Sequence, residues 1–339
     1  MVQLTLLIFF SSLTSIVLSL TRMLESNFMP RIGFGCWKVP REATADVVYD
    51  AIKVGYRAFD CACDYGNDVE VGHGLKRAMD EGIVSRSDIF VTNKLWSTYH
   101  GHVEAACQKS LEDMQLDFFD LYLIHFPIAI KFVPFEVRYP PSWAHDPAAS
   151  NPKIELSNVP YSQVWVGMEA LKKSGVAKHI GVCNLNVQGL REVCASCEIR
   201  PENLQVELHP YLTQNRLVAY VKDTLGIPVT AYSPLGASSY IEIGLADSVG
   251  VLDEAVVKDI AAKHGRTAAQ VILAWHLSRG VSVIPKSSKL SRIKENFDIL
   301  NITLEPAEIA AIGALNRNKR FNDPGVFCVG LGGSIPIFD

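Results

Sequence analysis

The sequence has little net charge and few cysteines, and neither is concentrated in one region. Its 32 Lys and Arg are scattered among 36 Asp and Glu, which gives a formal net charge of -4. A nucleic-acid-binding domain normally has a basic excess on one face, so we exclude nucleic acid as a partner. The eight cysteines are spread along the chain, so we expect reduced thiols rather than the dense disulfides of a small secreted protein.

Motifs for metal and phosphate binding are scarce. Cys194 and Cys197 form a single CxxC, whereas a zinc ribbon needs two such pairs, so we interpret both as ordinary thiols and expect no metal site. No GxGxxG follows a β-rich run, which disfavours an open dinucleotide-binding sheet. The late GLGG at 330–333 follows no strand and precedes no helix, so we expect a flexible tail there.

Residues 1–25 form an apolar segment that allows several interpretations. It has no charge beyond the amino terminus until Arg22, and it lacks the basic start and small-residue cleavage site of a secretory signal. Serines and a threonine at 11–15 interrupt it, which disfavours a membrane-spanning helix. A third interpretation makes Val17–Thr21 an extra hairpin strand. We expect a cytoplasmic protein, with secretory, organellar and anchored forms as alternatives.

From residue 31 onward, short β-rich runs alternate with segments of helical period, as in a parallel sheet with crossover helices. Strands are predicted at 31–35, 58–60, 89–95, 119–125, 179–184, 204–208, 228–233 and 281–286. Helices are predicted at 43–54, 69–79, 103–114, 161–173, 185–197, 217–224, 254–264 and 290–297. This repetition predicts an α/β fold, a closed (β/α)₈ TIM barrel, over 26–339.

Three connections are longer than a barrel needs: 127–160, 234–253 and the tail after Ile312. Long loops commonly carry substrate specificity. The first is rich in proline and in aromatic residues, which suits a pocket wall; these are Phe132, Phe135, Tyr139 and Trp143. We expect the C-terminal tail to supply a substrate loop.

Polar residues close three consecutive predicted strands. Asp60 ends the second, Lys94 lies near the end of the third, and His125 ends the fourth; Tyr65 follows Asp60 in the next loop. Taken singly, each has an ordinary structural interpretation: Asp60 as a helix cap, Lys94 as a solvated charge and His125 as a buried histidine. The carboxyl ends of neighbouring barrel strands meet at one mouth, however, so we expect the four side chains to form a catalytic site.

These four groups suit reduction of an aldehyde, in which a cofactor brings a hydride and the protein supplies a proton. We expect Tyr65 to be the acid, with its pKa lowered by the Lys94 ammonium. Asp60 would hold Lys94, and His125 would polarise the carbonyl. No metal is needed.

With these residues and the motifs around them, the chain resembles the aldo-keto reductase superfamily, and specifically its D-xylose (aldose) reductase branch. The motifs are GFGCWK at 33–38, GYRAFD at 55–60, KLW at 94–96, DLYLIHFP at 120–127, QVELHPYL at 205–212, AYSPLG at 231–236, IPKS at 284–287 and RFNDP at 320–324. The resemblance spans about residues 29 to 324, and the tetrad Asp60, Tyr65, Lys94 and His125 matches the family's catalytic positions. It implies NADPH-dependent reduction of aldoses such as D-xylose, and of other aldehydes, to alcohols.

The resemblance also implies the cofactor contacts. The residues facing the nicotinamide and pyrophosphate would be Asn184, Gln205, Tyr232, Ser233 and Leu235, and those facing the 2′-phosphate and adenine would be Lys286, Ser287, Arg292, Glu295 and Asn296. Two cations and a hydroxyl at the start of a helix independently suit an anion. Cys183 stands where the family usually has Ser, and Ser288 where Asn is common. NADPH is expected, with NADH use left open.

For the substrate, the resemblance implies contacts from Trp37, Phe126 and Asn322, and an amide suits a polyol chain. Cys63 and the tail after Pro324 depart from the relatives. A glycoside hydrolase would need paired carboxylates at strand ends, which we do not find. An NADPH-binding redox sensor with little turnover stays an alternative, and the protein is expected to be a monomer or homodimer whose partner is a small aldehyde or aldose.

Overall fold

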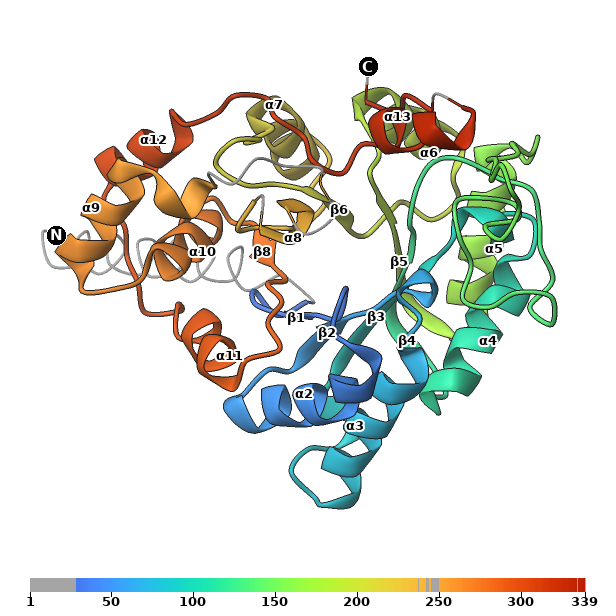
Figure 1. The fold of residues 1–339 in the computed structure, drawn as a ribbon, viewed down its shortest axis with the longest axis horizontal. Helices are drawn as coiled ribbons and strands as arrows, with labels where there is room; N and C mark the ends of the chain where they lie inside the picture. Colours follow the sequence, from blue (N-terminus) through green and yellow to red (C-terminus); the bar gives the residue numbers. More distant parts are fainter. Residues whose placement is uncertain (1–28, 237, 242–243, 245–249, 334, 339) are drawn as a thin grey trace, which may run out of the picture.

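The computed structural model describes residues 29–236, 238–241, 244, 250–333 and 335–338. The apolar segment 1–25 and its suggested hairpin strand lie outside these residues. Within the described part, parallel strands form a single sheet in chain order, β1 to β8 (Figure 1). Their bounds are β1 Phe34–Gly35, β2 Ala58–Asp60, β3 Phe90–Leu95, β4 Phe119–Ile124, β5 Ala177–Cys183, β6 Leu204–Glu207, β7 Val229–Tyr232 and β8 Ser282–Val283.

The sheet closes on itself because the chain just before β1 pairs with β8. The N–H of Gly33 donates to the carbonyl of Val283 at 2.8 Å, and the N–H of Val283 donates to the carbonyl of Arg31 at 3.0 Å. Both are main-chain bonds of a parallel ladder, with Ile32 paired to Val283. The predicted (β/α)₈ barrel is therefore confirmed, and all eight predicted strands overlap observed ones.

Helices surround the barrel. The crossover helices are α2 Arg41–Val54, α3 Asp68–Asp80, α4 Val103–Met114, α5 Tyr161–Ser174, α6 Val187–Ser196, α7 Asn215–Ala219 with the π-helical Tyr220–Thr224, α10 Ala268–Ser278 and α11 Leu290–Phe297. The others are the short α8 Ser238–Ile241, α9 Ala255–His264, α12 Pro306–Gly313 and α13 Pro324–Phe327. A 3₁₀ turn, η1, spans Cys63–Tyr65.

Helix α10, which leads into β8, is the main element that the sequence pattern does not predict. All residues from Gln270 to Leu277 are buried, so the helix is apolar around most of its circumference and lacks the 3.6-residue periodicity of a surface helix. Its start is nevertheless marked, because Thr267 and Gln270 form a reciprocal capping box. The predicted helix at 254–264 exists as α9, which lies earlier in the same connection between β7 and β8.

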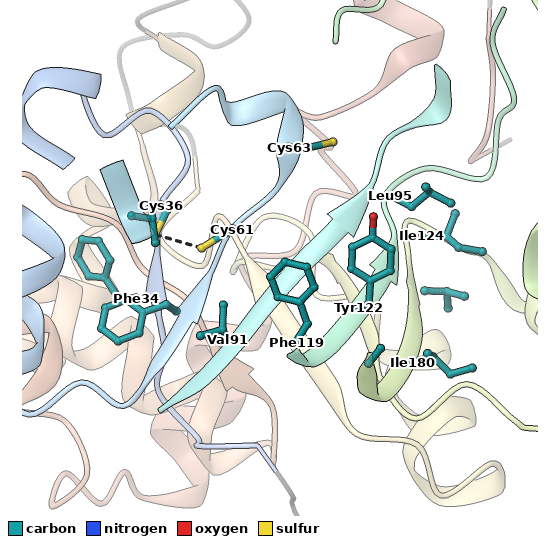
Figure 2. Packing of buried hydrophobic residues seen from close by; sticks show 14 of the residues in the cluster. Phe34, Cys36, Cys61, Cys63, Val91, Leu95, Phe119, Tyr122, Ile124 and Ile180 are labelled. Carbon is teal, nitrogen blue, oxygen red and sulfur yellow. Dashed lines mark hydrogen bonds between the residues drawn. The ribbon is translucent and has the colours of Figure 1, made fainter. Parts of the chain in front are cut away.

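The barrel has two apolar layers, one inside the sheet and one between the sheet and the helices. Along β4, Leu121 and Leu123 join an interior cluster with Met29. Tyr122 and Ile124, which alternate with them along the strand, pack in the outer layer (Figure 2). Side chains alternate between the faces of a strand, so a strand covered on both faces is apolar throughout. This rigid scaffold fixes the strand ends that carry the site.

Asp68, the first residue of α3, is a buried carboxylate whose ionisation opposes folding. It is 4% exposed and accepts a hydrogen bond from Asn93 at 3.1 Å, yet burial raises its pKa from 3.8 to about 7. The folded protein therefore holds this proton more tightly than the unfolded chain. The stability that this tightly held proton gives the folded protein is lost as the pH rises from about 4 to about 7.

We expect Asp68→Asn to remove this pH dependence. The gain in unfolding free energy should be small at pH 4 and grow to the order of 4 kcal/mol above pH 7, because the amide stays neutral while still accepting from Asn93. Urea denaturation at several pH values measures this. The exposed Asp46→Asn is the control, and an Asp68→Asn curve parallel to wild type from pH 4 to 8 would contradict the expectation.

Candidate active site

Asp60, Lys94 and Tyr65 meet at the carboxyl end of the barrel. The Lys94 ammonium, fully buried, forms an ion pair with Asp60 and donates to the Tyr65 hydroxyl at 3.1 Å. It also donates to the carbonyl of Cys61 at 2.9 Å. The other carboxylate oxygen of Asp60 accepts from Gln205 at 2.6 Å. The three residues predicted to act together are therefore in direct contact.

Local geometry explains this convergence. Strands β2 and β3 are neighbours with Asp60 opposite Thr92, so Lys94, further along β3, projects above the end of β2. After β2 the chain turns through η1 and reverses at Gly66, whose φ of 71° is in the left-handed region. Glycine adopts this conformation without strain. The turn places the Tyr65 hydroxyl beside the ammonium.

His125 follows β4 and faces the same space. Its ring lies edge-on to Tyr65, with centroids 5.9 Å apart, and stacks on Phe126. Its Nδ1 lies 2.9 Å from a carboxylate oxygen of Asp64, although these two atoms do not have hydrogen-bond geometry. With Nδ1 beside a carboxylate, Nε2 is the nitrogen left to act on a ligand.

Three of the four predicted catalytic side chains, those of Asp60, Tyr65 and His125, line a pocket of about 400 Å³. The predicted substrate residues Trp37, Phe126 and Asn322 also line it. The lining side chains that the sequence did not predict include Asp64, Trp96, Tyr240 and Phe327, whereas Trp143 was expected on a pocket wall and does line the pocket. A charged residue directly before Tyr65 and the KLW motif were the available signals for Asp64 and Trp96.

The predicted pKa shift of Tyr65 is wrong in sign. Burial raises its pKa well above the ordinary value, and the carboxylates of Asp60 and Asp64 add to this. Burial is the largest single effect on Lys94 and by itself would lower its pKa, but the charge and hydrogen bond of Asp60, together with the charge of Asp64 and the Cys183 thiol, raise the pKa overall. Because Asp60 neutralises the ammonium at close range, Tyr65 gains little net positive field. Both groups carry their protons at neutral pH.

Three predicted cofactor residues, Asn184, Gln205 and Tyr232, make hydrogen bonds to one another or to the predicted catalytic residues. The Tyr232 hydroxyl donates to the side-chain oxygen of Asn184 at 2.6 Å, and the Asn184 amide donates to the carbonyl of His125 at 2.9 Å. Asn184 has a φ of 57°, which asparagine tolerates better than most residues. Asn184 is therefore bonded to the main chain of His125 and Gln205 to the side chain of Asp60, which links both to the predicted catalytic residues.

The next predicted cofactor residues continue along the mouth. Ser233, Leu235 and Lys286 all line the pocket. Ser233 shares a hydrogen bond of 2.9 Å with the hydroxyl of Tyr240, and the ring of Tyr240 lies 5.6 Å from that of Trp37. The long 234–253 connection therefore contributes to the wall, as expected, through Tyr240.

The remaining predicted cofactor residues lie on α11 and the turn before it, outside the 400 Å³ pocket. The Ser287 hydroxyl accepts the N–H of Lys289 at 3.1 Å, and Arg292 is exposed on the helix. Glu295 accepts from Thr267 at 2.7 Å, whereas Asn296 is buried. Lys286 connects this group to the pocket along the chain.

The long 127–160 connection covers the pocket only in part. Trp143 packs edge-on against Trp96 and Phe126 and reaches Phe327 from the C-terminal segment at 5.6 Å. Phe132 and Phe135, by contrast, pack against Tyr99, and Tyr139 packs against Phe135. The GLGG region also differs from a free tail, because Val329–Leu331 form a 3₁₀ turn and the Leu331 carbonyl accepts from Ile154 at 3.0 Å.

The eight cysteines are all free thiols, in agreement with their scattered spacing. Among the residues that the structure describes, no group of three or more His, Cys, Asp or Glu is arranged to hold a metal ion. The same part of the chain contains no helix with the length and apolar character required to span a bilayer.

Comparison with known proteins gives a consistent result. Residues 31–317 match the Aldo/keto reductase family. The chain is 50% identical over 301 residues to the probable NAD(P)H-dependent D-xylose reductase of Aspergillus fumigatus, covering 87% of this chain and 94% of that protein. For the Aspergillus clavatus protein of the same name, identity is 47% over 331 residues, with 94% and 99% covered.

A solved structure is also similar. The aldose reductase from Schistosoma japonicum superposes with a TM-score of 0.78 at 35% identity, covering 87% of this chain and 91% of that one. The barrel, the converging Asp60, Tyr65 and Lys94, and these comparisons agree. The chain belongs to the Aldo/keto reductase family.

Proposed function

We propose that this protein uses NADPH to reduce the aldehyde of an open-chain aldose, of which D-xylose is the type, to an alcohol. The observation that carries the proposal is the 3.1 Å contact between the Lys94 ammonium and the Tyr65 hydroxyl in a pocket that His125 also lines. The names of the fungal relatives, NAD(P)H-dependent D-xylose reductases, support the same substrate class.

The bound nicotinamide cofactor would supply the hydride. The Tyr65 hydroxyl gives its proton to the oxygen of the reduced carbonyl, and its raised pKa keeps that proton in place until the oxygen becomes basic. Lys94 then lies against the phenolate oxygen and stabilises its charge, while Asp60 keeps Lys94 oriented. His125 orients the carbonyl through the nitrogen that does not face Asp64.

The pocket suits a hydroxylated chain. Aromatic rings of Trp37, Trp96 and Phe126 form its walls, and polar groups of Asp64 and Asn322 lie on its lining. A carboxylate accepts hydrogen bonds from hydroxyl groups, and an amide both donates and accepts. A sugar presents hydroxyl groups along one edge and C–H groups along its faces, so it can satisfy both kinds of surface.

The cofactor fits the donor set at the start of α11. Lys286, Ser287 and Arg292 offer two cations and a hydroxyl close to a helix N-terminus, where a phosphate is stabilised. We therefore assign the 2′-phosphate of NADPH to these residues, and the adenine to the neighbourhood of Glu295 and Asn296. Asn184, Gln205 and Tyr232 would contact the nicotinamide end.

We expect Arg292→Ala to weaken NADPH binding roughly tenfold and to leave NADH binding nearly unchanged, because NADH lacks the 2′-phosphate. Fluorescence titration with each cofactor gives the two Kd values. Lys294→Ala, which removes another exposed cation from the same helix, is the matched control. Equal loss for both cofactors would show that Arg292 does not read the phosphate.

A turnover assay tests the function directly. Loss of NADPH absorbance with D-xylose and with glyceraldehyde should continue through many turnovers, with formation of the corresponding alcohols. A redox sensor of the same fold would bind NADPH and stop after about one turnover. That outcome would reject the proposed function in favour of the sensor.

We also infer a cytoplasmic location from the thiols. All eight cysteines are unpaired, which is typical of proteins kept in a reducing compartment. Mass spectrometry of the mature amino terminus and fractionation of the host cell test this inference; recovery in a secreted fraction would overturn it.

A further inference from the structure

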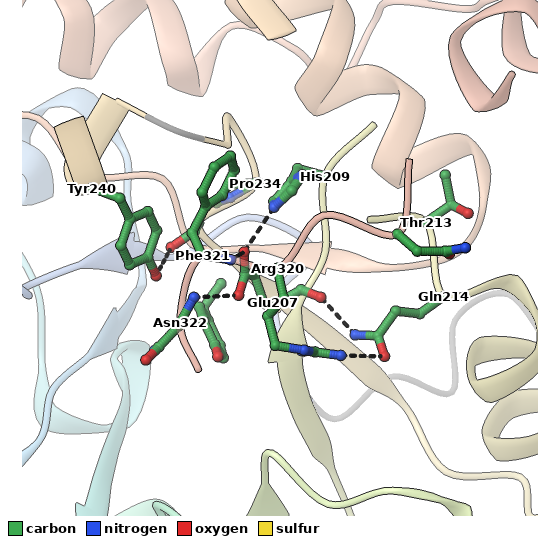
Figure 3. Close-up of polar contacts among 12 residues, drawn as sticks. Glu207, His209, Thr213, Gln214, Pro234, Tyr240, Arg320, Phe321 and Asn322 are labelled. Atoms are coloured by element: carbon green, nitrogen blue, oxygen red, sulfur yellow. Dashed lines mark hydrogen bonds and ion pairs between the residues drawn. The ribbon is translucent and has the colours of Figure 1, made fainter. Parts of the chain in front are cut away.

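Glu207, at the end of β6, is a fully buried carboxylate that no step described above uses. One oxygen accepts the main-chain N–H of Phe321 and the other that of Asn322, both at 2.9 Å (Figure 3). The Nε2 atom of His209, also fully buried, lies 2.8 Å from the same carboxylate. Three donors therefore converge on one charge.

This arrangement fixes the backbone at 321–322. A buried carboxylate is tolerated only where donors replace its water shell, and hydrogen bonds to an ionised acceptor are stronger than neutral ones. The His209 ring also lies 5.1 Å from that of Phe321. Displacing this segment would leave Glu207 without two of its donors, so the segment is held firmly in one position.

A second set of contacts holds the residues just before it. Gln214 donates to the carbonyl of Glu207 at 2.7 Å and accepts from Arg320 at 3.2 Å. The main-chain N–H groups of Arg317 and Lys319 both donate to the carbonyl of Tyr211. The segment 317–322 is thus attached along its length to the connection that follows β6, which belongs to the rigid barrel.

The attachment matters because this segment enters the pocket. Asn322 lines the pocket, as does Phe327 further along the chain. Since Glu207 binds the main chain of Asn322, the carboxylate sets where the side-chain amide lies without contacting a ligand itself.

We propose that Glu207, oriented by His209, is a positioning residue for recognition of polyhydroxylated substrates: it holds Asn322 where the amide can bond a sugar hydroxyl. This inference rests on the proposed function, in which Asn322 contacts the substrate. It makes discrimination between sugars and hydroxyl-free aldehydes depend on a buried charge outside the pocket.

The test is Glu207→Gln, which keeps the size of the side chain but places an amide donor against a main-chain donor. We expect KM for D-xylose to rise roughly tenfold with kcat within about twofold of wild type. KM for butanal, which has no hydroxyl groups, should change less than about twofold. Calorimetry should show xylitol binding weakened to the same degree as xylose KM, with NADPH Kd unchanged.

Glu169→Gln is the matched control. Glu169 is a buried carboxylate that also accepts two consecutive main-chain N–H groups, those of Glu198 at 2.7 Å and Ile199 at 2.8 Å, and it is not part of the pocket lining. Glu169→Gln should lose stability like Glu207→Gln but keep the wild-type ratio of KM for xylose to KM for butanal. Should Glu207→Gln fail to fold, Gln214→Ala should shift the ratio in the same direction by a smaller factor.

The outcomes are separable. Absence of wild-type turnover rejects the proposed function, and the xylitol measurement still decides the role of Glu207. The proposal would be overturned if Glu207→Gln changed KM equally for xylose and butanal, or left the xylitol Kd unchanged. It would also be overturned if Glu169→Gln changed the ratio of the two KM values as much as Glu207→Gln does.

Discussion

Tyr65→Phe is expected to lower kcat by about 10²–10⁴-fold while leaving the Kd for NADPH unchanged. Among the tetrad residues, Tyr65 is the one whose hydroxyl proton lies next to Lys94, with the hydroxyl oxygen 3.1 Å from the ammonium nitrogen. Phenylalanine keeps the ring that packs edge-on to His125, so the pocket retains its shape. Steady-state kinetics with D-xylose and fluorescence titration of NADPH measure the two quantities.

The control for this prediction is Tyr99→Phe. Tyr99 is another buried phenol, fully covered and outside the pocket lining, so loss of its hydroxyl should leave kcat within about twofold of wild type. Turnover by Tyr65→Phe at more than about a tenth of the wild-type rate would mean that another group supplies the proton.

Lys94→Met is expected to impair both stability and turnover. It removes the ion pair with Asp60 and leaves a carboxylate that is 3% exposed without its cation. Breaking a buried pair in this way costs about 3–5 kcal/mol of unfolding free energy. Urea denaturation measures this loss, and kcat should fall at least as far as in Tyr65→Phe because the phenolate loses its stabilising charge.

A double variant separates the two effects of Lys94. Adding Asp60→Asn to Lys94→Met removes the unpaired charge while keeping a group that can bond Gln205. We expect recovery of at least half of the lost stability and no recovery of kcat. Recovery of turnover together with stability would show that Lys94 serves folding rather than the reaction.

The sequence predicts that Asp60, Lys94 and His125 meet at one end of the barrel, because a strand end is a local feature. An apolar run that closes on Asp60 or His125 identifies both the strand and the side of the barrel on which the residue lies. Closure of the barrel then brings these ends together without any further information. Gln205 and Tyr232, by contrast, were expected from the family resemblance and not from the strand pattern; they lie within β6 and at the end of β7.

The residues that the sequence missed depend on loop paths. Tyr240 and Phe327 belong to long connections whose course is set by contacts with distant segments, such as Trp143 with Phe327. The sign of the Tyr65 pKa shift also required three dimensions. A neighbouring Lys94 was expected to lower it, but burial and the charges of two carboxylates act together to raise it.

The closure of the barrel between the start and the end of the domain has a consequence for synthesis. Arg31 reaches the carbonyl of Leu277 across 246 positions of the chain, and main-chain bonds join Gly33 to Val283. Although Asp60, Lys94 and His125 leave the ribosome early, the first strand has an unsatisfied edge until the eighth is made. A nascent chain arrested before β8 should therefore expose that edge to aggregation and to holding chaperones.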